Sequence, residues 1–591
     1  MRTDPPAQED RPPTLSRQAS DGHEGLRNWR IGLWASIGAF TLLSLTVVIV
    51  IVWNALVHEA IWSGALGYVF DSMQYLAWIR EGSDHVLSGN LFWTEPPIRD
   101  YLNPGLIISS GLHLLGLSIP LSYAFWVPVG IILVCWAVVK YVGDFIPSGW
   151  GKVAAVALAL LYKIPIHDLL QGRVPSRNLN AVTYAGFDAW PVYWSWGFSL
   201  TGVAVALLCG GLLVYDRVRN SGKRFSVALA AMALLCSWLQ PWQGATLLAV
   251  VIGGEILGRW ILGRDSDAGL RGRLTLLGST AVFGILPLVY YAILGKYDEA
   301  WRINGIQANN YVSGASWWTA FAILGPLLLG AATALRFKPK GFRDIAIRIW
   351  PVIAIVQLIV IQSTQIGNTA THALKGITVP LATLTVIGLS PWFKTMGRKT
   401  SPILSGGIAV LLIGLLFVPG AIDQVKAQVN EMQLEGRGGY FIAADNERAL
   451  DFIAASPRKG SVYATSLFSS MVPWRSDRNT WVGHETWTPR FQGRSYFNEQ
   501  VLAAALPSVA NGMSPAAVVR WTGASFVLQD CYHTYLDRFR PHESLRAQLA
   551  PITKSVHQFG CATVYEIVDG PRGPAPPDIG RYHLDWTKAD G

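Results

Sequence analysis

The sequence predicts a polytopic α-helical membrane protein, with about eleven transmembrane helices and a C-terminal extracytoplasmic α/β domain. Three observations support this fold class. Hydrophobic residues make up 51% of the 591 residues and charged residues 15%, whereas a soluble domain averages about 25% charged residues. Apolar runs close to the roughly 20 residues that cross a bilayer recur as far as residue 420. From residue 421 the composition becomes that of a soluble domain.

The chain begins with a polar segment, residues 1–26, which is predicted to be a disordered cytoplasmic tail because it has too few apolar residues to fold. The first apolar run, 31–57, is far longer than the roughly 7–15 residues of a signal-peptide core, so we expect an uncleaved first span. The transmembrane domain is expected over 27–420. Its other apolar runs lie near 120–142, 151–165, 194–215, 225–239, 243–262, 273–295, 315–335, 347–364, 374–392 and 402–420.

Basic segments at alternate connections predict the orientation. The segments that follow even-numbered spans are strongly basic: 216–224, 263–273, 336–348 and 393–400. Eleven spans with a cytoplasmic N-terminus place all of them in the cytoplasm of a multi-pass plasma-membrane protein, as the positive-inside rule requires. These loops account for the net charge of +10, so we expect a lipid bilayer and no nucleic acid as partner. The outer face then receives 58–119, 166–193, 240–244, 296–314, 362–373 and everything after 420.

Two outer regions are large enough to build a site. The first outer loop, 58–119, contains an apolar stretch at 103–118 that is too short to span comfortably and is predicted to lie in the membrane interface. The domain at 421–591 alternates predicted helices ("NERALDFIAAS", "PAAVVRWTG") with predicted strands ("SVYATS", "ASFVLQD", "CATVYEIV"), which indicates a small α/β fold. Cys531 ends one of these strands and Cys561 begins another, so the two could pair in an oxidising outer compartment.

Asp71 is the most informative polar residue of the first outer loop. In "DSMQYLAWIREG", Asp71, Tyr75 and Trp78 share one helix face, because they lie at i, i+4 and i+7. One interpretation is a helix cap, since a carboxylate at the start of a helix meets the positive end of the helix dipole. The other is a general base at the membrane boundary. The residues alone leave both interpretations open.

This arrangement resembles the GT-C superfamily of membrane glycosyltransferases, which includes protein O-mannosyltransferases and the aminoarabinose transferases of lipid A. The shared features are a long first span, a large outer loop opening with Asp, interfacial helices, many further spans and an outer soluble domain. The stretches "DSMQYLAWIREGSDHVLSGNLFWTEP" (71–96) and, more loosely, "WVGHETWTP" (481–489) also resemble a bacterial group within this superfamily.

The resemblance implies a GT-C-like fold and an activity. A sugar would pass from a polyprenyl-phosphate donor to an acceptor hydroxyl of a cell-envelope glycan, lipid or protein, with inversion, and Asp71 would be the catalytic base. Such a phosphate leaves without an acid, so one carboxylate suffices, unlike in the glycosidases. The chain departs from the O-mannosyltransferases in one respect. They carry an Asp-Glu pair, and here Ser72 follows Asp71, so mannosyl transfer to protein is not implied.

Cations at the outer face are candidates to bind the donor phosphate. The best cluster is "KYDEAWRINGIQANNY" (296–311), with Lys296 and Arg302, and Lys375 in "THALKG" is next. Arg80, Arg173 and Arg177 are further candidates. The alternative for each is a side chain that reaches up to lipid headgroups, which is common at membrane interfaces.

Acceptor or sugar binding is assigned to Tyr75, Glu95, Asp188 and Trp190. The alternatives are a loop cap for Asp188, a turn for Glu95 and an interfacial anchor for Trp190. His484 and Glu485 supply too few ligands for a zinc site, so we expect a structural loop or one that covers the membrane cavity. The sequence predicts no cofactor and leaves a divalent metal ion open.

The rival interpretation is a non-enzymatic transporter, flippase or assembly factor for cell-surface polysaccharide, in which Asp71 is structural. A transporter is expected to carry ionisable groups near mid-membrane and to consist of two halves of matching hydropathy. Neither pattern is visible in the sequence, so the glycosyltransferase is favoured.

Overall fold

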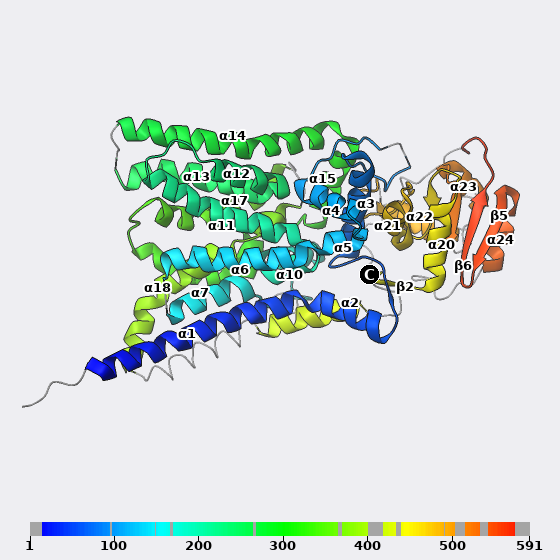
Figure 1. Cartoon of the computed structure of the whole chain (residues 1–591). Helices are drawn as coiled ribbons and strands as arrows, with labels where there is room; N and C mark the ends of the chain where they lie inside the picture. Colours follow the sequence, from blue (N-terminus) through cyan, green and yellow to red (C-terminus); the bar gives the residue numbers. More distant parts are fainter. Residues whose placement is uncertain are drawn as a thin grey trace, which may run out of the picture.

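The computed structural model contains a long helical bundle with a smaller mixed domain at one end (Figure 1). The residues that it describes are 15–94, 97–147, 149–165, 169–263, 267–364, 369–399, 418–432, 439–489, 491–502, 514–531 and 542–573. Within these ranges the chain is mostly helical, with a small mixed sheet near its C-terminus.

Within the described ranges, seven helical stretches are long and apolar enough to cross a membrane, and a bent helix pair raises the number to eight. They contain α5 (Ile119–Ala124) with α6 (Trp126–Phe145), α11 (Ser199–Asn220), α13 (Pro241–Ile261), α14 (Asp267–Tyr297), α16 (Trp317–Ala332) with η1 (Thr333–Arg336), α17 (Phe342–Thr364), and η2 (Ala370–Leu374) with α18 (Thr378–Lys399). The protein is therefore a polytopic membrane protein, and each of these helices matches one of the predicted apolar runs.

The bent pair corresponds to the predicted first span. It consists of α1 (Leu15–Ser44) and α2 (Thr46–Val57), which meet at an angle of 51°. Helix α1 also extends into the tail that composition predicts to be disordered, because adding residues to an existing helix costs less than starting a new one. Residues 1–14 of that tail lie outside the described residues.

The remaining predicted spans are shorter than expected or lie outside the described residues. Helices α7 (Trp150–Leu161) and α12 (Val227–Leu239) are apolar, but they have only 12 and 13 residues. Both lie inside the bundle beside the longer helices (Figure 1). The predicted span at 402–420 falls mostly outside the described residues. The structure therefore provides seven or eight candidate spans of full length, and the prediction of eleven stays a prediction.

The first outer loop folds into short helices at the end of the bundle next to the C-terminal domain. It contains β1 (Ile61–Trp62), α3 (Val69–His85) and α4 (Pro104–Leu114). Helix α4 forms within the stretch predicted to be interfacial, and it starts at an Asn103 cap with Pro104 at its first position. Three more helices lie at this end: α9 (Ser176–Ala189), α10 (Pro191–Gly197) and α15 (Glu299–Tyr311).

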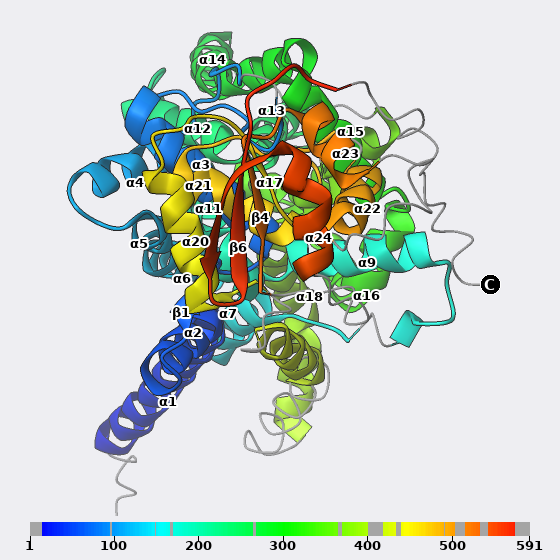
Figure 2. The same ribbon diagram turned by 90° about the vertical axis from the view of Figure 1, so that its right-hand side faces the viewer.

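The C-terminal domain is built on a four-stranded mixed sheet with strand order β3-β4-β6-β5. The strands are β3 (Val462–Tyr463), β4 (Phe526–Gln529), β5 (Thr553–Phe559) and β6 (Ala562–Ile567), and only β3 and β4 are parallel. The sheet lies between α20 (Ala444–Ala455) on one side and α23 (Pro515–Thr522) with α24 (His542–Leu549) on the other (Figure 2). Every helix and strand predicted for this domain is present, and β5 and α24 are among the elements that were not predicted.

A disulfide bond joins Cys531 to Cys561, with their Cα atoms 5.0 Å apart. It connects Cys531, two residues beyond the end of β4, to Cys561, which directly precedes β6, and these two strands are neighbours in the sheet. The pairing expected from the sequence is therefore confirmed. Cys135, Cys209 and Cys236 are buried free thiols of the bundle.

The C-terminal domain is attached to the first outer loop along several elements. Strand β2 (Phe441–Ile442) pairs with β1 in antiparallel fashion. Helix α21 (Ser466–Ser476) packs against α3, and the indole of Trp474 donates to the sulfur of Met73 at 3.1 Å. The helix that carries Asp71 is thus held between the membrane bundle and the C-terminal domain.

Candidate active site

A cavity of about 880 Å³ opens where the bundle, the outer-loop helices and the C-terminal domain meet. Its wall is formed by α3, α9, α15, η2, the ends of α12, α14 and α17, and a loop of residues 481–489 from the C-terminal domain. Several residues singled out from the sequence line this one cavity: Asp71, Tyr75, Asp188, Lys296, Arg302, Lys375, His484 and Glu485.

Asp71 lies in the first turn of α3 but does not cap it. The N-cap position is Tyr68, whose side chain makes no capping hydrogen bond. The carboxylate keeps 32% of its surface exposed and lines the cavity together with Tyr75 and Trp78. The shared face predicted from helical periodicity therefore points into the cavity, and the side chain of Asp71 is accessible from it.

His484 reaches Asp71 from the C-terminal domain. Its Nε2 atom lies 3.3 Å from Oδ1 of Asp71, and its side chain is 1% exposed. The rings of Phe70 and Phe92 flank the imidazole, with centroids 6.2 and 5.4 Å away. Although the distance is short, this contact lacks the alignment of a hydrogen bond in the conformation seen here.

Glu485, next to His484, is a second carboxyl group in the same wall. It accepts a hydrogen bond from the hydroxyl of Tyr68 at 2.5 Å. Burial raises the pKa of Glu485 above its usual value and the charge of Asp71 adds to this, although Tyr68 and His484 oppose it. The loop expected to cover the membrane cavity does so and brings both residues to its wall.

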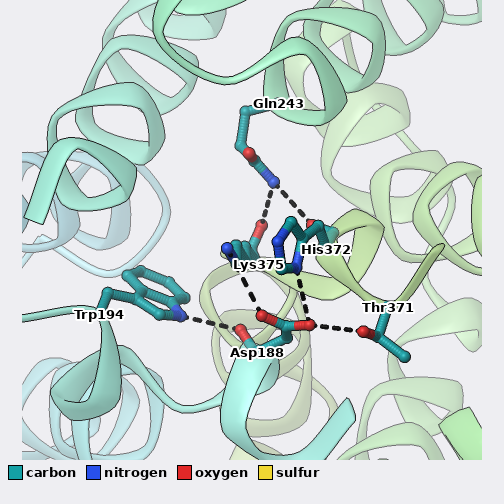
Figure 3. Close-up of polar contacts among 6 residues, drawn as sticks. All are labelled: Asp188, Trp194, Gln243, Thr371, His372 and Lys375. Carbon is teal, nitrogen blue, oxygen red and sulfur yellow. Dashed lines mark hydrogen bonds and ion pairs between the residues drawn. The ribbon is translucent and has the colours of Figure 1, made fainter. Parts of the chain in front are cut away.

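Asp188, which also lines the cavity, is the centre of a buried polar cluster (Figure 3). Its Oδ2 atom accepts from Thr371 at 2.6 Å and lies 3.0 Å from Nδ1 of His372, while Oδ1 lies 3.5 Å from Nζ of Lys375. Gln243 donates to the backbone carbonyls of His372 and Lys375, which fixes the turn that carries them. Burial alone would raise the pKa of Asp188, but His372, Lys375 and Thr371 outweigh it, and the pKa is below its usual value.

Two more cations lie along the cavity wall near α15. Lys296 is in the last turn of α14, and Arg302 is in the first turns of α15, where it makes an exposed ion pair with Glu299 at 3.7 Å. Asp298 caps α15 by accepting from the backbone of Trp301 at 2.8 Å. The polar cluster predicted at 296–311 is thus divided between two helices that share this wall.

Three indole rings form an aromatic corner of the cavity. The rings of Trp78 and Trp301 are parallel within 7°, with centroids 6.2 Å apart. Trp487, from the covering loop, stands nearly perpendicular to both, with centroid distances of 5.3 and 4.9 Å. Flat apolar faces beside polar groups are the usual surface on which amphipathic ligands bind.

Other candidates from the sequence lie elsewhere. Arg80 is on α3 but donates to the carbonyl of Trp474 at 3.2 Å, which holds it against α21. Trp190 is fully buried and packs on Trp196 with centroids 5.4 Å apart, so its ring does not reach the cavity. Arg173 and Arg177 are exposed outside the cavity wall. Glu95 lies outside the described residues.

The structure adds His372 and Tyr68 to the cavity. His372 stands three residues before Lys375 in "THALKG", and in the 3-10 turn that contains it both side chains reach Asp188. That spacing was the one available signal. Tyr68 gave none, because its partner Glu485 is 417 residues away in the chain.

No known protein-family model matches the sequence, and no curated protein matches it. Solved membrane proteins with a similar fold include the following three. The Archaeoglobus fulgidus oligosaccharyltransferase in the apo form matches at 11% identity over 84% of this chain and 69% of that one, with a TM-score of 0.47. ArnT from Cupriavidus metallidurans bound to undecaprenyl phosphate matches at 11% identity over 93% and 99%, with a TM-score of 0.38. Arabinofuranosyltransferase AftD from Mycobacteria matches at 14% identity over 92% and 42%, with a TM-score of 0.45.

The identities of these matches lie between 11% and 14%, and each of their TM-scores is below 0.5. Likenesses this distant identify no substrate and no catalytic residue for the present chain.

Proposed function

We propose that this protein is an integral membrane glycosyltransferase that moves a sugar from a polyprenyl-phosphate donor to an acceptor hydroxyl on the outer face of the membrane, with inversion. The observation that carries the proposal is the composition of the cavity. A partly exposed carboxylate, Asp71, shares one space of about 880 Å³ with the cations Lys296, Arg302 and Lys375 and with three indole rings.

Asp71 is proposed as the general base. Its carboxylate takes the proton of the acceptor hydroxyl while the acceptor oxygen bonds to the anomeric carbon of the sugar. The bond from that carbon to the phosphate oxygen breaks, and the phosphate departs with the electron pair. Attack from the face opposite the leaving group inverts the anomeric carbon. A positioned base of this kind contributes about 10²–10⁴ in rate.

The cations are proposed to bind the phosphate. Lys375 is 2% exposed and is held by Asp188, while His372 adds a ring 21% exposed in the same cluster. Lys296 and Arg302 are the more accessible cations of the wall. Fixed positive groups stabilise the charge that develops on a departing phosphate. Asp188, proposed from the sequence as an acceptor ligand, is better placed as the counter-ion of this cluster.

The same proposal includes the topology. We place residues 1–26 in the cytoplasm, the transmembrane domain at 27–420 with eleven spans, and 421–591 outside. Helices α7 and α12 and the run at 402–420 would complete the eleven. The partners are then the bilayer, a lipid-linked sugar and a cell-envelope acceptor.

The test is transfer by the purified full-length protein supplied with a panel of radiolabelled polyprenyl-phosphate hexoses and pentoses. We expect Asp71→Asn to lower turnover by about 10²-fold or more while leaving donor binding nearly intact, because an amide cannot take up the proton. Asn and Asp rank alike at helix caps, so a purely structural role would leave turnover near normal.

Asp84→Asn is the matched control, since Asp84 is an exposed carboxylate of the same helix. It should turn over like the wild type. Near-normal turnover by Asp71→Asn would end the role of this residue as base. If the wild-type protein used none of the donors, the glycosyltransferase proposal would fail in favour of a transporter or assembly factor.

A further inference from the structure

We infer that His484 is a positioning residue for Asp71, so that the C-terminal domain completes the active site by holding its base. This inference rests on the proposed function and assigns a role to the domain within it. The pair is formed between α3 in the first outer loop and the loop at 481–489, which are more than 400 residues apart in the chain.

The loop that carries His484 is anchored both to α15 and to the first outer loop. The amide of Gln307, on α15, donates to the carbonyls of Thr486 and Thr488 at 3.1 and 2.9 Å. Asn90, in the first outer loop, donates to the carbonyl of Trp487 at 3.0 Å. The hydroxyl of Thr488 in turn accepts from the backbone N–H of His484 at 3.2 Å. The imidazole is therefore fixed to the elements that form the cavity.

The backbone of the loop selects the tautomer of the neutral ring. The N–H of Thr486 donates to Nδ1 of His484 at 3.1 Å. An imidazole nitrogen that accepts a hydrogen bond carries no proton, so the ring proton is on Nε2. Nε2 is the atom that lies 3.3 Å from Oδ1 of Asp71. The loop thus presents an N–H donor to the carboxylate.

Because Nε2 of His484 is buried, its N–H needs an acceptor nearby, and the carboxylate of Asp71 is in the right place to be that acceptor. Nε2 is buried and makes no hydrogen bond to the described residues in this conformation, and a buried donor left unsatisfied is costly. Within the described part of the chain, Asp71 is the one carboxylate within 4.0 Å of it. Asp71 is a third exposed on the cavity side, so its carboxylate has room to turn into alignment.

In this arrangement the two carboxylate oxygens of Asp71 have different roles. The N–H of His484 holds Oδ1, which leaves the lone pairs of Oδ2 for the proton of the acceptor hydroxyl. During transfer that proton moves to Asp71, and His484 keeps its own. The histidine acts by orienting the base, and small errors in the orientation of a reacting group can cost about 10²-fold in rate.

Kinetics of three variants of the full-length protein test this role. His484→Phe keeps a ring between Phe70 and Phe92 but removes the donor, so we expect kcat to fall about 10- to 100-fold with the KM for the donor nearly unchanged. His484→Gln keeps an N–H donor and should recover part of kcat. His557→Phe is the matched control, because His557 lies 3.8 Å from a carboxylate of Glu566 on the sheet, outside the cavity.

The thermal stability of each variant shows whether a loss of kcat comes from a misoriented Asp71 or from a less stable fold. A kcat of His484→Phe within about twofold of the wild type would overturn the inference. So would a loss of kcat that accompanies a matching loss of stability and is not recovered by His484→Gln.

A second measurement needs no donor. Magic-angle-spinning NMR of the full-length protein, labelled with ¹⁵N-histidine in lipid bilayers, should show a ring signal with a protonated Nε2 that disappears in His484→Phe and shifts in Asp71→Asn. An unchanged signal in Asp71→Asn would refute the contact. If no donor were turned over but the signal shifted, the pair would stand and the proposed glycosyl transfer alone would fail.

Discussion

Asp188 supplies the negative charge that balances the buried ammonium group of Lys375 in the cavity wall. The carboxylate is 7% exposed, and it faces a lysine that is 2% exposed. An ion pair of this kind is a weak source of net stability, but removing one partner strands the other charge in an apolar site. Since Thr371 and His372 also contact Asp188, this residue keeps the whole cluster in place.

Asp188→Asn is therefore expected to lower the free energy of unfolding by about 3 kcal/mol or more, because Lys375 would be left without a counter-charge. Denaturant unfolding of the purified protein measures this. Asp144→Asn is the matched control, since Asp144 also lies near two arginines, at 3.9 and 3.7 Å, but is 29% exposed. Adding Lys375→Met to Asp188→Asn should restore part of the loss. If it does not, the stranded charge is not the cause.

The lowered pKa of Asp188 also predicts how its contribution to stability changes with pH. Because this pKa is below its usual value, the stabilising contribution of the carboxylate is present above the ordinary Asp pKa of about 3.9 and is lost as pH falls through the lower folded-state pKa. The stability difference between wild type and Asp188→Asn should thus be smaller at pH 3 than at pH 5. A larger difference at pH 3 would contradict the assignment.

Helix α3 is positioned by a contact between two glycines that lie 130 residues apart in the chain. A Cβ atom added to Gly67 would lie 2.8 Å from the backbone nitrogen of Gly197, at the end of α10, and the reverse substitution meets Gly67 in the same way. The hydroxyl of Tyr440 donates to the carbonyl of Gly67, and that of Tyr123 donates to the carbonyl of Gly197. The start of the helix that carries Asp71 is therefore fixed by backbone contact.

Gly67→Ala should force α3 and α10 apart, because a backbone neighbour cannot rotate away as a side chain can. We expect a loss of about 1–3 kcal/mol in stability, the usual cost of overpacking, together with lower turnover. Thermal unfolding and the transfer assay measure the two effects. Gly111→Ala, on α4, is the control, since nothing lies within 4 Å of the added atom. Equal behaviour of the two variants would show that the contact is not needed.

The elements that the sequence predicts well are those with a local signal. Helical periodicity placed Asp71, Tyr75 and Trp78 on one face, and that face lines the cavity. An apolar run indicates that a segment is buried in lipid, but it does not indicate whether the helix is straight or bent. For this reason the sequence predicted one span at 31–57, where the structure has a bent pair of helices. Strand β5 has a mostly polar sequence and is formed by pairing with β6, so no local pattern indicated it.

The site residues, too, could be predicted only as far as the local sequence indicates them. Cations at an outer interface were recognisable as candidates, but lipid headgroups and a bound phosphate attract the same side chains, so Arg80 and Lys375 could not be told apart. Their contacts in the structure distinguish them, because Arg80 donates to the carbonyl of Trp474, outside the cavity, whereas Lys375 pairs with Asp188 in the cavity wall. The contact of His484 with Asp71 joins two domains, and such contacts follow from the packing of the whole molecule.

The disulfide bond stabilises the C-terminal domain as a whole. It closes a loop of about 30 residues between neighbouring strands, for which the chain-entropy model gives about 3–4 kcal/mol. Cys531→Ser with Cys561→Ser should lower the stability of the domain by about this amount. Non-reducing mass spectrometry of the wild type should find the two peptides joined. Two free thiols in protein taken from the membrane would contradict the pairing.

Two independent features support the orientation proposed for the whole molecule. Disulfide bonds persist in oxidising compartments, which agrees with the proposed place of the C-terminal domain on the outer face. Helices α11 and α12 meet at the basic segment 216–224, and the far end of α12 reaches the cavity at Leu239. The basic segment near 336–343 joins η1 to α17, whose far end reaches the cavity at Ile361. These two basic segments therefore lie at the end of the bundle opposite the C-terminal domain, where the positive-inside rule expects them.

Single-cysteine labelling of intact cells with a membrane-impermeant maleimide tests this orientation. Tyr297→Cys and Lys459→Cys should react from outside, and other positions in 296–314 and 440–590 should behave alike where they are exposed. Asn220→Cys and Lys338→Cys should react only after the cells are permeabilised. All four positions are exposed, and the free native thiols are buried, so access across the membrane decides the result. Labelling of Asn220→Cys in intact cells would overturn the eleven-span topology, because it would put a basic loop and the C-terminal domain on the same side.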